Sequence, residues 1–206
     1  MKRRDMLAGT GTTVLSGLLP WTATAQSSQA PKLIGFMRTN WSRDPFSFGT
    51  YSHIAKGSQR KDHRRLAEPV ADKVYFAGEA ANPDRNSSVH AALESGRLVA
   101  SQIAASGHKR IGVIGAGVSG LVAAHAMSNA GLDVHVIEGR DRIGGRINTD
   151  RSLGFAADLG ASWLHGIDGN PLTAVVKQAG MRKFVYDPNG IARVQGREIS
   201  LNNLPN

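Results

Sequence analysis

The chain has 206 residues, of which 41% are hydrophobic and 20% charged, and its formal net charge is +9. This composition excludes wholesale disorder and allows one domain with a sizeable core, or two small ones. The absence of cysteine excludes disulfides, thiolate metal sites and a cysteine nucleophile. The seven histidines lack the paired spacing of a metal centre, so no metal site is predicted.

Residues 1–25 have the three parts of an export signal. A basic start, Lys2–Arg4, precedes a mildly apolar run, Met6–Leu19, and Ala23–Ala25 offers small residues for cleavage. The run is too short and too rich in Gly and Thr to span a membrane, so no stable insertion is expected after its removal. Arg3-Arg4 resembles a bacterial twin-arginine signal, which predicts a periplasmic or secreted protein. An ordinary secretory signal or an uncleaved anchor is the alternative.

Part of the positive charge lies in the run KGSQRKDHRR, Lys56–Arg65. Such a run can contact nucleic acid or another anionic surface. It lacks the interleaved aromatic residues that a stacking platform requires. We therefore predict a solvated loop and no nucleic-acid partner.

A strand and a long helix are predicted next. KVYFA, Lys73–Ala77, has the β-branched and aromatic residues of a strand. Ser88 is a suitable N-cap for a helix over Ser88–Ala105. The apolar residues of that helix share one face: Val89, Ala92, Leu93, Gly96, Val99 and Ile103. With a following strand, Arg110–Ile114, these elements are predicted to form a right-handed β-α-β crossover.

The most informative motif is a glycine fingerprint between a strand and a helix. Lys109–Ile114 ends in a short apolar run suited to a buried parallel strand. Three glycines with G-x-G-x-x-G spacing follow it: Gly115, Gly117 and Gly120. Leu121–Ala130 has helix-forming residues and is ended by Gly131, and a second strand, DVHVIE, closes with Glu138. This order predicts an α/β, Rossmann-like cofactor-binding domain with a parallel sheet.

Each part of the fingerprint has a physical task. Gly115 allows the tight turn, Gly117 lets the backbone approach a pyrophosphate, and Gly120 allows helix and strand to pack closely. The helix N-terminus, around Ser119, presents N–H groups to phosphates. Glu138, 21 residues beyond Gly117, can accept hydrogen bonds from ribose hydroxyls and disfavours the 2′-phosphate of NADP. These residues leave both FAD and NAD open.

The sequel to Glu138 favours FAD by resemblance. GRDRIGGR, Gly139–Arg146, resembles the E-A-R-x-R-x-G-G-R segment of the flavin-containing amine oxidase superfamily. The resemblance implies that Arg140 and Arg146 lie near the pyrophosphate and that Gly144 and Gly145 pass close to the cofactor.

A second block resembles the polyamine-oxidase-like members of this superfamily. DLGASWLHGIDGNPL, Asp158–Leu172, is similar to the segment that lies beside their flavin ring. The resemblance implies four residues beside the ring: Gly160, Ala161, Ser162 and Trp163. Trp163 and His165 are otherwise ordinary core and loop residues, and His165 receives no role.

Motifs that come late in this superfamily come early here. TNWSRDPFSFGTYS, Thr39–Ser52, resembles a W-x-x-D-P-x-S-x-G-x-Y-S segment. Leu66–Ala80 and Ser87–Ile103 resemble the C-terminal flavin motif. This resemblance implies that Glu79 contacts the ribose or the pyrophosphate of FAD.

The start of the helix after Ser88 is the second place where backbone N–H groups are expected to meet the cofactor. By the same resemblance Ser88 and Val89 lie at the pyrimidine edge of the flavin, where the helix dipole stabilises negative charge. Ser87 and Ala91 stand where the family usually has glycine.

The chain is therefore predicted to be a circular permutation of the family order. Residues 30–106 form the C-terminal-type FAD segment, 107–180 the fingerprint segment, and 181–206 the start of an incomplete substrate domain. Within the last, KFVYDPNGIARVQGREI is predicted to form two strands joined at Asp187–Gly190. The substrate domain is expected to be largely absent, so no catalytic residue is assigned.

The resemblance implies an FAD-dependent oxidase that cleaves a C–N bond of a small-molecule amine, with hydride transfer to flavin and O2 as acceptor. The alternative is an inactive or weakly flavin-binding fragment of such an oxidase. A third hypothesis is a basic surface-binding module that uses Lys56–Arg65.

Overall fold

The structure, a computed structural model, describes residues 33–185, 191–194 and 197–200. The chain divides into two compact units, Met1–Phe36 and Met37–Asn206. All helices and strands described here belong to the second unit. Among the described residues, no helix is long and apolar enough to cross a membrane.

A β-α-β unit forms at the fingerprint, as predicted. β1 (Arg110–Ile114) and β2 (Asp133–Ile137) pair in parallel, and α3 (Val118–Asn129) connects them. α3 begins earlier than Leu121 because the first turn of the helix is built from the fingerprint itself, with Gly117 as N-cap.

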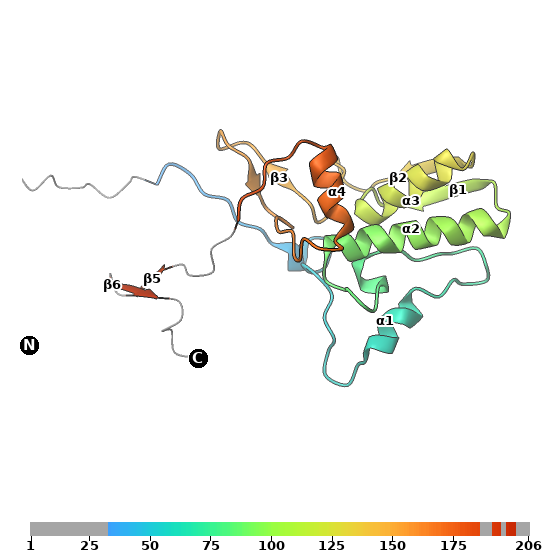
Figure 1. Ribbon diagram of the computed structural model, residues 1–206, viewed down its shortest axis with the longest axis horizontal. Coiled ribbons are helices and arrows are strands. Elements are labelled where there is room, and N and C mark those ends of the chain that lie inside the picture. The colour runs from blue at the N-terminus through green and yellow to red at the C-terminus, as the bar shows by residue number, and fades with distance from the viewer. Residues whose placement is uncertain (1–32, 186–190, 195–196, 201–206) are drawn as a thin grey trace, which may run out of the picture. The chain divides into compact units, whose positions relative to one another are not determined.

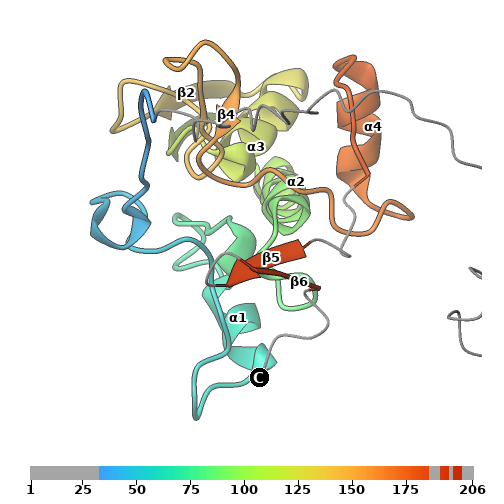
Figure 2. The same ribbon diagram turned by 90° about the vertical axis from the view of Figure 1, so that its left-hand side faces the viewer.

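The long helix α2 (Val89–Ser106) packs along α3 (Figures 1 and 2). Its predicted N-cap is confirmed, since the Ser88 side chain accepts a hydrogen bond from the Ala91 N–H at 3.2 Å. The helix ends at Gly107, which is in the left-handed conformation. On the predicted apolar face, four residues are buried: Leu93, Gly96, Val99 and Ile103.

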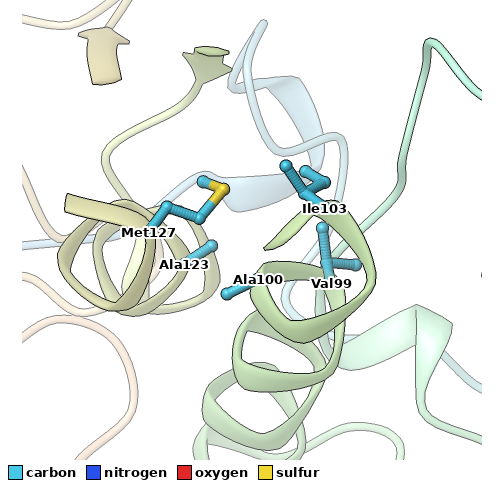
Figure 3. Close-up of a cluster of buried hydrophobic side chains, with 5 residues drawn as sticks. All are labelled: Val99, Ala100, Ile103, Ala123 and Met127. Atoms are coloured by element: carbon cyan, nitrogen blue, oxygen red, sulfur yellow. The ribbon is translucent and has the colours of Figure 1, made fainter. Parts of the chain in front are cut away.

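The core lies between α2, α3 and one face of the sheet. Val99, Ala100 and Ile103 of α2 form one buried cluster with Ala123 and Met127 of α3, and Figure 3 shows Ala100 pointing toward Ala123. Three sheet residues pack against this cluster: Ile111, Val113 and Val134. Burial of a side chain as large as Met127 contributes about 2 kcal/mol to the free energy of unfolding.

The other face of the sheet is open in the described part of the chain. Ile114, at the end of β1, is 89% exposed, and Ile137, at the end of β2, is 60% exposed. The strand predicted to be buried is therefore half-buried, because helices cover only one face of a sheet that has two strands.

The predicted strand Lys73–Ala77 is wrong, and so is the crossover that it was to form through α2. Ala71 and Asp72 both have φ of 52°, and the tight turn that they make is closed by a single antiparallel bridge. Directly after this segment the chain is tied to α2, since the Gly78 N–H donates to the Ser95 hydroxyl at 3.2 Å. An extended segment becomes a strand only when a neighbour pairs with it.

The prediction of a solvated loop over Lys56–Arg65 is also wrong for its second half. α1 (Arg60–Leu66) starts with a capping box between Gln59 and Asp62. Its His63 is buried, with Nδ1 2.7 Å from the carbonyl oxygen of Ala80. The remaining basic side chains of the run are exposed.

Short elements complete the described chain. They are η1 (Trp41–Arg43), η2 (Glu79–Ala81), β3 (Thr149–Asp150), β4 (Ala157–Asp158), α4 (Pro171–Gln178), β5 (Ile191–Val194) and β6 (Arg197–Ser200). β3 pairs antiparallel with β4, and β5 pairs antiparallel with β6.

The C-terminal hairpin differs from the prediction. The turn predicted at Asp187–Gly190 lies outside the described residues. Both paired strands follow it, because Val194 pairs with Arg197 and leaves only residues 195–196 between them. A spacing of two residues between paired strands is a common hairpin length.

Candidate cofactor-binding site

The fingerprint glycines make the tight turn from β1 into α3. Gly115 has φ of 101°, which glycine adopts readily, and its N–H donates to the Ile137 carbonyl at 2.7 Å. A Cβ on Gly120 would collide with the carbonyl oxygen of Gly115. Gly120 therefore has the packing task that the sequence assigned to it.

Gly117 faces open space at the N-terminus of α3. A Cβ added there meets no protein atom within 4 Å. The sequel to β2 runs beside it: Gly144 bridges to Gly117, and the Gly144 N–H donates to the Ala116 carbonyl at 2.8 Å. Glycines from two backbone segments thus border one space, and the absence of side chains there allows a pyrophosphate to approach the protein backbone closely.

Glu138 lies directly after β2 and is tied to the fingerprint loop. One carboxylate oxygen accepts from the Ala116 N–H at 2.7 Å, and the other accepts from the Arg140 N–H at 3.0 Å. These backbone hydrogen bonds hold the pKa of Glu138 below its ordinary value. A carboxylate has about four acceptor positions, so ribose hydroxyls can still bond to it.

Arg140 is held by the early segment of the chain. Its guanidinium lies 5.1 Å from the centroid of the Phe46 ring, pairs with Asp44, and donates to the Ser47 hydroxyl at 2.9 Å. Burial raises the pKa of Asp44, but the Phe46 N–H and the charge of Arg140 outweigh burial and leave it lowered. The aspartate and serine of the D-P-x-S motif therefore anchor the residue predicted to lie near the pyrophosphate.

Glu79 is a buried carboxylate with several donors. Arg146 approaches it at 2.7 Å, the Ser52 hydroxyl donates at 2.6 Å, and the Ser87 N–H donates at 2.7 Å. Burial alone raises the pKa of Glu79, but the hydrogen bonds from Ser52, Arg146 and Ser87 together lower it. Glu79 is therefore ionised at neutral pH, and it joins the segments before and after the fingerprint.

Ser87 has a backbone conformation that explains why glycine is usual at this position. Its φ is 68°, in the left-handed region, and its hydroxyl donates to the Ser52 carbonyl. Ala91, the other departure from glycine, is fully buried in the first turn of α2.

The segment beyond β4 closes another side of the same space. The Ala161 N–H donates to the Arg146 carbonyl at 3.2 Å, and a Cβ on Gly160 would collide with that carbonyl. The Trp41 indole N–H donates to the Leu159 carbonyl at 2.9 Å, so the early segment also holds this wall in place.

These elements enclose a cleft of about 830 Å³. All predicted site residues except Gly120 line it: Glu79, Ser88, Val89, Gly115, Gly117, Ser119, Glu138, Arg140, Gly145, Arg146, Gly160, Ala161, Ser162 and Trp163. The first turns of α2 and α3 both border the cleft, so two helix N-termini favour negative charge within it.

Other lining residues carried no assigned role in the sequence. Trp41, Ser47 and Tyr51 belong to the early motif, from which the sequence predicts no site role. Phe46 and Thr50 are variable positions of that motif and Thr39 precedes it, so these three carry no local signal. Close packing at Gly96 was also missed: a Cβ there would collide with the Ser119 carbonyl oxygen. Gly96 thus fixes how near α2 approaches the start of α3.

The fold and the cleft define an α/β protein that binds a dinucleotide cofactor. A family model described as flavin containing amine oxidoreductase matches residues 3–104 and 118–199. The chain belongs to this family, and its cofactor is FAD.

The sequence identity to individual proteins is high, but it extends over only about a third of this chain. The chain is 56% identical over 73 residues to "Probable polyamine oxidase 4" of Arabidopsis thaliana, covering 35% of this chain and 15% of that protein. It is 54% identical over 70 residues to "Polyamine oxidase 3" of Oryza sativa subsp. japonica, covering 34% of this chain and 14% of that protein.

A solved structure of putrescine oxidase bound to putrescine also matches. Its sequence identity is 33% and its TM-score 0.37, over 48% of this chain and 23% of that chain. The chain thus spans about a seventh of the length of the two plant relatives.

The residues present fit FAD. The open space at Gly117, the uncapped start of α3 and the glycines at 144–145 suit a pyrophosphate, and Glu138 suits a ribose. A second helix N-terminus, at Ser88, borders the same cleft and suits the electron-rich end of a flavin.

Proposed function

We propose that this chain forms the FAD-binding part of an oxidase that cleaves a C–N bond of a small-molecule amine. The observation that carries the proposal is the single cleft bordered by the fingerprint, its sequel, the segment beyond β4 and the start of α2. The names of the plant relatives favour a polyamine as the amine.

When bound, FAD supplies an acceptor for the hydride on the carbon beside the amine nitrogen, and O2 serves as the terminal acceptor. The chain's own residues bind and orient the cofactor. Gly117 and the first turn of α3 receive phosphates, Glu138 receives ribose hydroxyls, and Arg146 compensates the buried charge of Glu79.

We further propose that the chain is a circular permutation of the family order, with residues 30–106 preceding 107–180. The order of the motifs in the sequence supports it, and contacts between the two segments fit one shared cleft. Arg146 donates to the Thr50 carbonyl at 3.1 Å, and Trp41 donates to the Leu159 carbonyl at 2.9 Å. Both bonds cross the join, so the permuted order still lets one cleft form.

The visible spectrum of the chain tests the cofactor proposal. After mixing with FAD and desalting, we expect retained flavin absorption in the unchanged chain and in Arg64→Gln, which alters an exposed residue of α1. Gly117→Val places a side chain in the cleft and is expected to remove the bands. A colourless unchanged chain would favour the inactive fragment instead.

Amine oxidation is tested on the flavin-loaded chain. Mixing with spermidine or putrescine without oxygen is expected to bleach the flavin absorption, and admitting air is expected to restore it. Bound flavin that no amine bleaches would limit the function to cofactor binding.

For the N-terminus we propose export by the twin-arginine route to the periplasm. The basic start, apolar run and small-residue site within residues 1–25 support it. Replacing Arg3 and Arg4 by lysine is expected to retain a reporter fused to these residues in the bacterial cytoplasm. Continued export of that variant would favour the ordinary secretory signal.

A further inference from the structure

A second pocket, of about 350 Å³, lies on the early segment and the sequel to β2. Its lining is rich in cations and side-chain amides. The residues concerned are Arg38, Asn40, Arg43, Arg142 and Asn148. None of these five lines the cofactor cleft.

The charge of this pocket is strongly positive. Asp44 is the one acidic residue among the described residues that line it, and its carboxylate is already paired with Arg140. The lining of this pocket thus contains three arginines, and the carboxylate of Asp44 already has Arg140 as its partner.

The three arginines differ in how they are held. Nη1 of Arg142 donates to the carbonyls of Ile143 and Ile147 at 3.2 and 3.3 Å, which anchors one nitrogen of its guanidinium. The side chains of Arg38 and Arg43 are exposed and make no hydrogen bond within the part of the chain that the structure describes. An arginine carries five N–H donors, so this cluster has ample capacity for an oxyanion.

We propose that this pocket binds a small phosphate-bearing molecule. Guanidinium groups bind phosphate oxygens in pairs of parallel hydrogen bonds, and a dianion matches three cations better than a single carboxylate does. Asn40 and Asn148 add polar groups for the rest of the ligand. The pocket volume exceeds what a free phosphate ion needs, so a phosphate ester suits it best.

The pocket shares a wall with the cofactor cleft. Thr39, Trp41 and Leu159 line both, and the Trp41 N–H holds the Leu159 carbonyl at 2.9 Å. A ligand that changes the packing of this wall changes the cleft, and such coupling is reciprocal in free energy. Occupancy of the pocket is therefore expected to shift the affinity for FAD. This coupling rests on the proposed function, whereas binding of the anion to the pocket is independent of the proposed function.

Tryptophan fluorescence tests the site, because Trp41 lies in its wall. The chain is titrated with inorganic phosphate, glycerol 3-phosphate, succinate and chloride at constant ionic strength. We expect saturation with the two phosphates, tighter for the ester, no saturation with chloride, and loss of the signal in Trp41→Phe. Arg43→Gln and Arg142→Gln are each expected to weaken phosphate binding about tenfold, while Arg64→Gln leaves it unchanged.

Several outcomes would overturn the proposal. Equal responses to chloride and phosphate would indicate general screening, and tighter binding of succinate would assign the pocket to carboxylates. If phosphate binding is unchanged in Arg43→Gln but is abolished by FAD, the phosphate binds at the start of α3 and not in this pocket. Because Arg43 lies in an exposed short turn, its variant remains informative even where Arg142→Gln fails to fold.

The titration is repeated with flavin retention as a second readout. A change in FAD affinity with phosphate, absent in Arg43→Gln, supports the coupling, and an unchanged affinity overturns it. A chain that binds phosphate through Arg43 but never binds FAD would contradict the proposed function alone.

Discussion

The carboxylate of Glu79 and the guanidinium of Arg146 lie 2.7 Å apart, although 67 positions separate them in the chain. Glu79 comes from the segment that resembles the C-terminal motif of the family's sequences, and Arg146 comes from the segment that resembles their N-terminal motif. Because Glu79 is 7% exposed, its charge depends on this partner and on Ser52 and Ser87. One ion pair thus links the two parts of the cleft.

Removal of the cation from this pair is expected to destabilise the fold. Arg146→Leu leaves the buried charge of Glu79 without its cation, and we expect a loss of about 2 kcal/mol in the free energy of unfolding. Urea denaturation without FAD measures it. Arg85→Leu is the matched control: its pair with Glu94 spans 3.4 Å, with side chains 46% and 34% exposed, and a loss of about 0.5 kcal/mol is expected. Equal losses in the two variants would contradict the prediction.

Acid is expected to destabilise the chain through Glu79. Its pKa in the folded chain lies below the ordinary value of 4.5, so the unfolded state takes up the proton first as the pH falls. The stability that this carboxylate contributes is fully present above pH 4.5 and is lost as the pH falls through the lower pKa of the folded chain. Glu79→Gln is expected to be less stable at neutral pH and to show a shallower acid limb in urea denaturation. An unchanged acid limb would assign the loss to other carboxylates.

Local signals predicted the elements whose residues decide their own conformation. The glycine spacing after β1, the Ser88 cap and the apolar face of α2 each depend on neighbours within a few positions, and the structure contains all three. In the structure, fourteen of the fifteen predicted site residues line one cleft, and most of these were implied by the family resemblance and not by a local signal.

The predictions that the structure contradicts concern residues whose conformation depends on partners distant in the sequence. Lys73–Ala77 has the composition of a strand, but no strand among the described residues pairs with it, and composition does not report tertiary pairing. His63 is buried within a basic run because α1 packs near Ala80, 17 positions away. The contacts of Arg140 with Asp44 and Ser47 likewise cross more than 90 positions, so no local pattern indicates them.

Ser87 offers a test of backbone strain beside the cleft. At φ of 68° a serine is strained by about 1 kcal/mol, and its hydroxyl bond to the Ser52 carbonyl offsets that cost. Ser87→Ala keeps the strain and loses the bond, so we expect a loss of about 1 kcal/mol in the free energy of unfolding. Ser87→Gly loses the bond but also the strain, and we expect it to stay within about 0.5 kcal/mol of the unchanged chain. Thermal or urea unfolding compares them, and equal destabilisation by both would show that strain is absent.

Two fingerprint glycines are expected to separate folding from cofactor binding. Gly120→Ala brings a Cβ against the Gly115 carbonyl oxygen and to 3.3 Å from a methyl of Val113, so we expect a loss of about 2 kcal/mol in the free energy of unfolding.

Gly117→Ala is the matched variant. Its φ of −77° suits alanine and its Cβ meets no protein atom within 4 Å, but alanine is a poorer N-cap than glycine, so the free energy of unfolding is expected to fall by no more than about 1 kcal/mol. That Cβ projects into the space proposed for the pyrophosphate, and the affinity for FAD is expected to fall about tenfold. Urea denaturation and flavin fluorescence titration measure the two effects on the same samples. A Gly117→Ala chain that binds FAD as tightly as the unchanged one would show that the cofactor backbone does not pass this glycine, and the assignment of the cleft would fail with it.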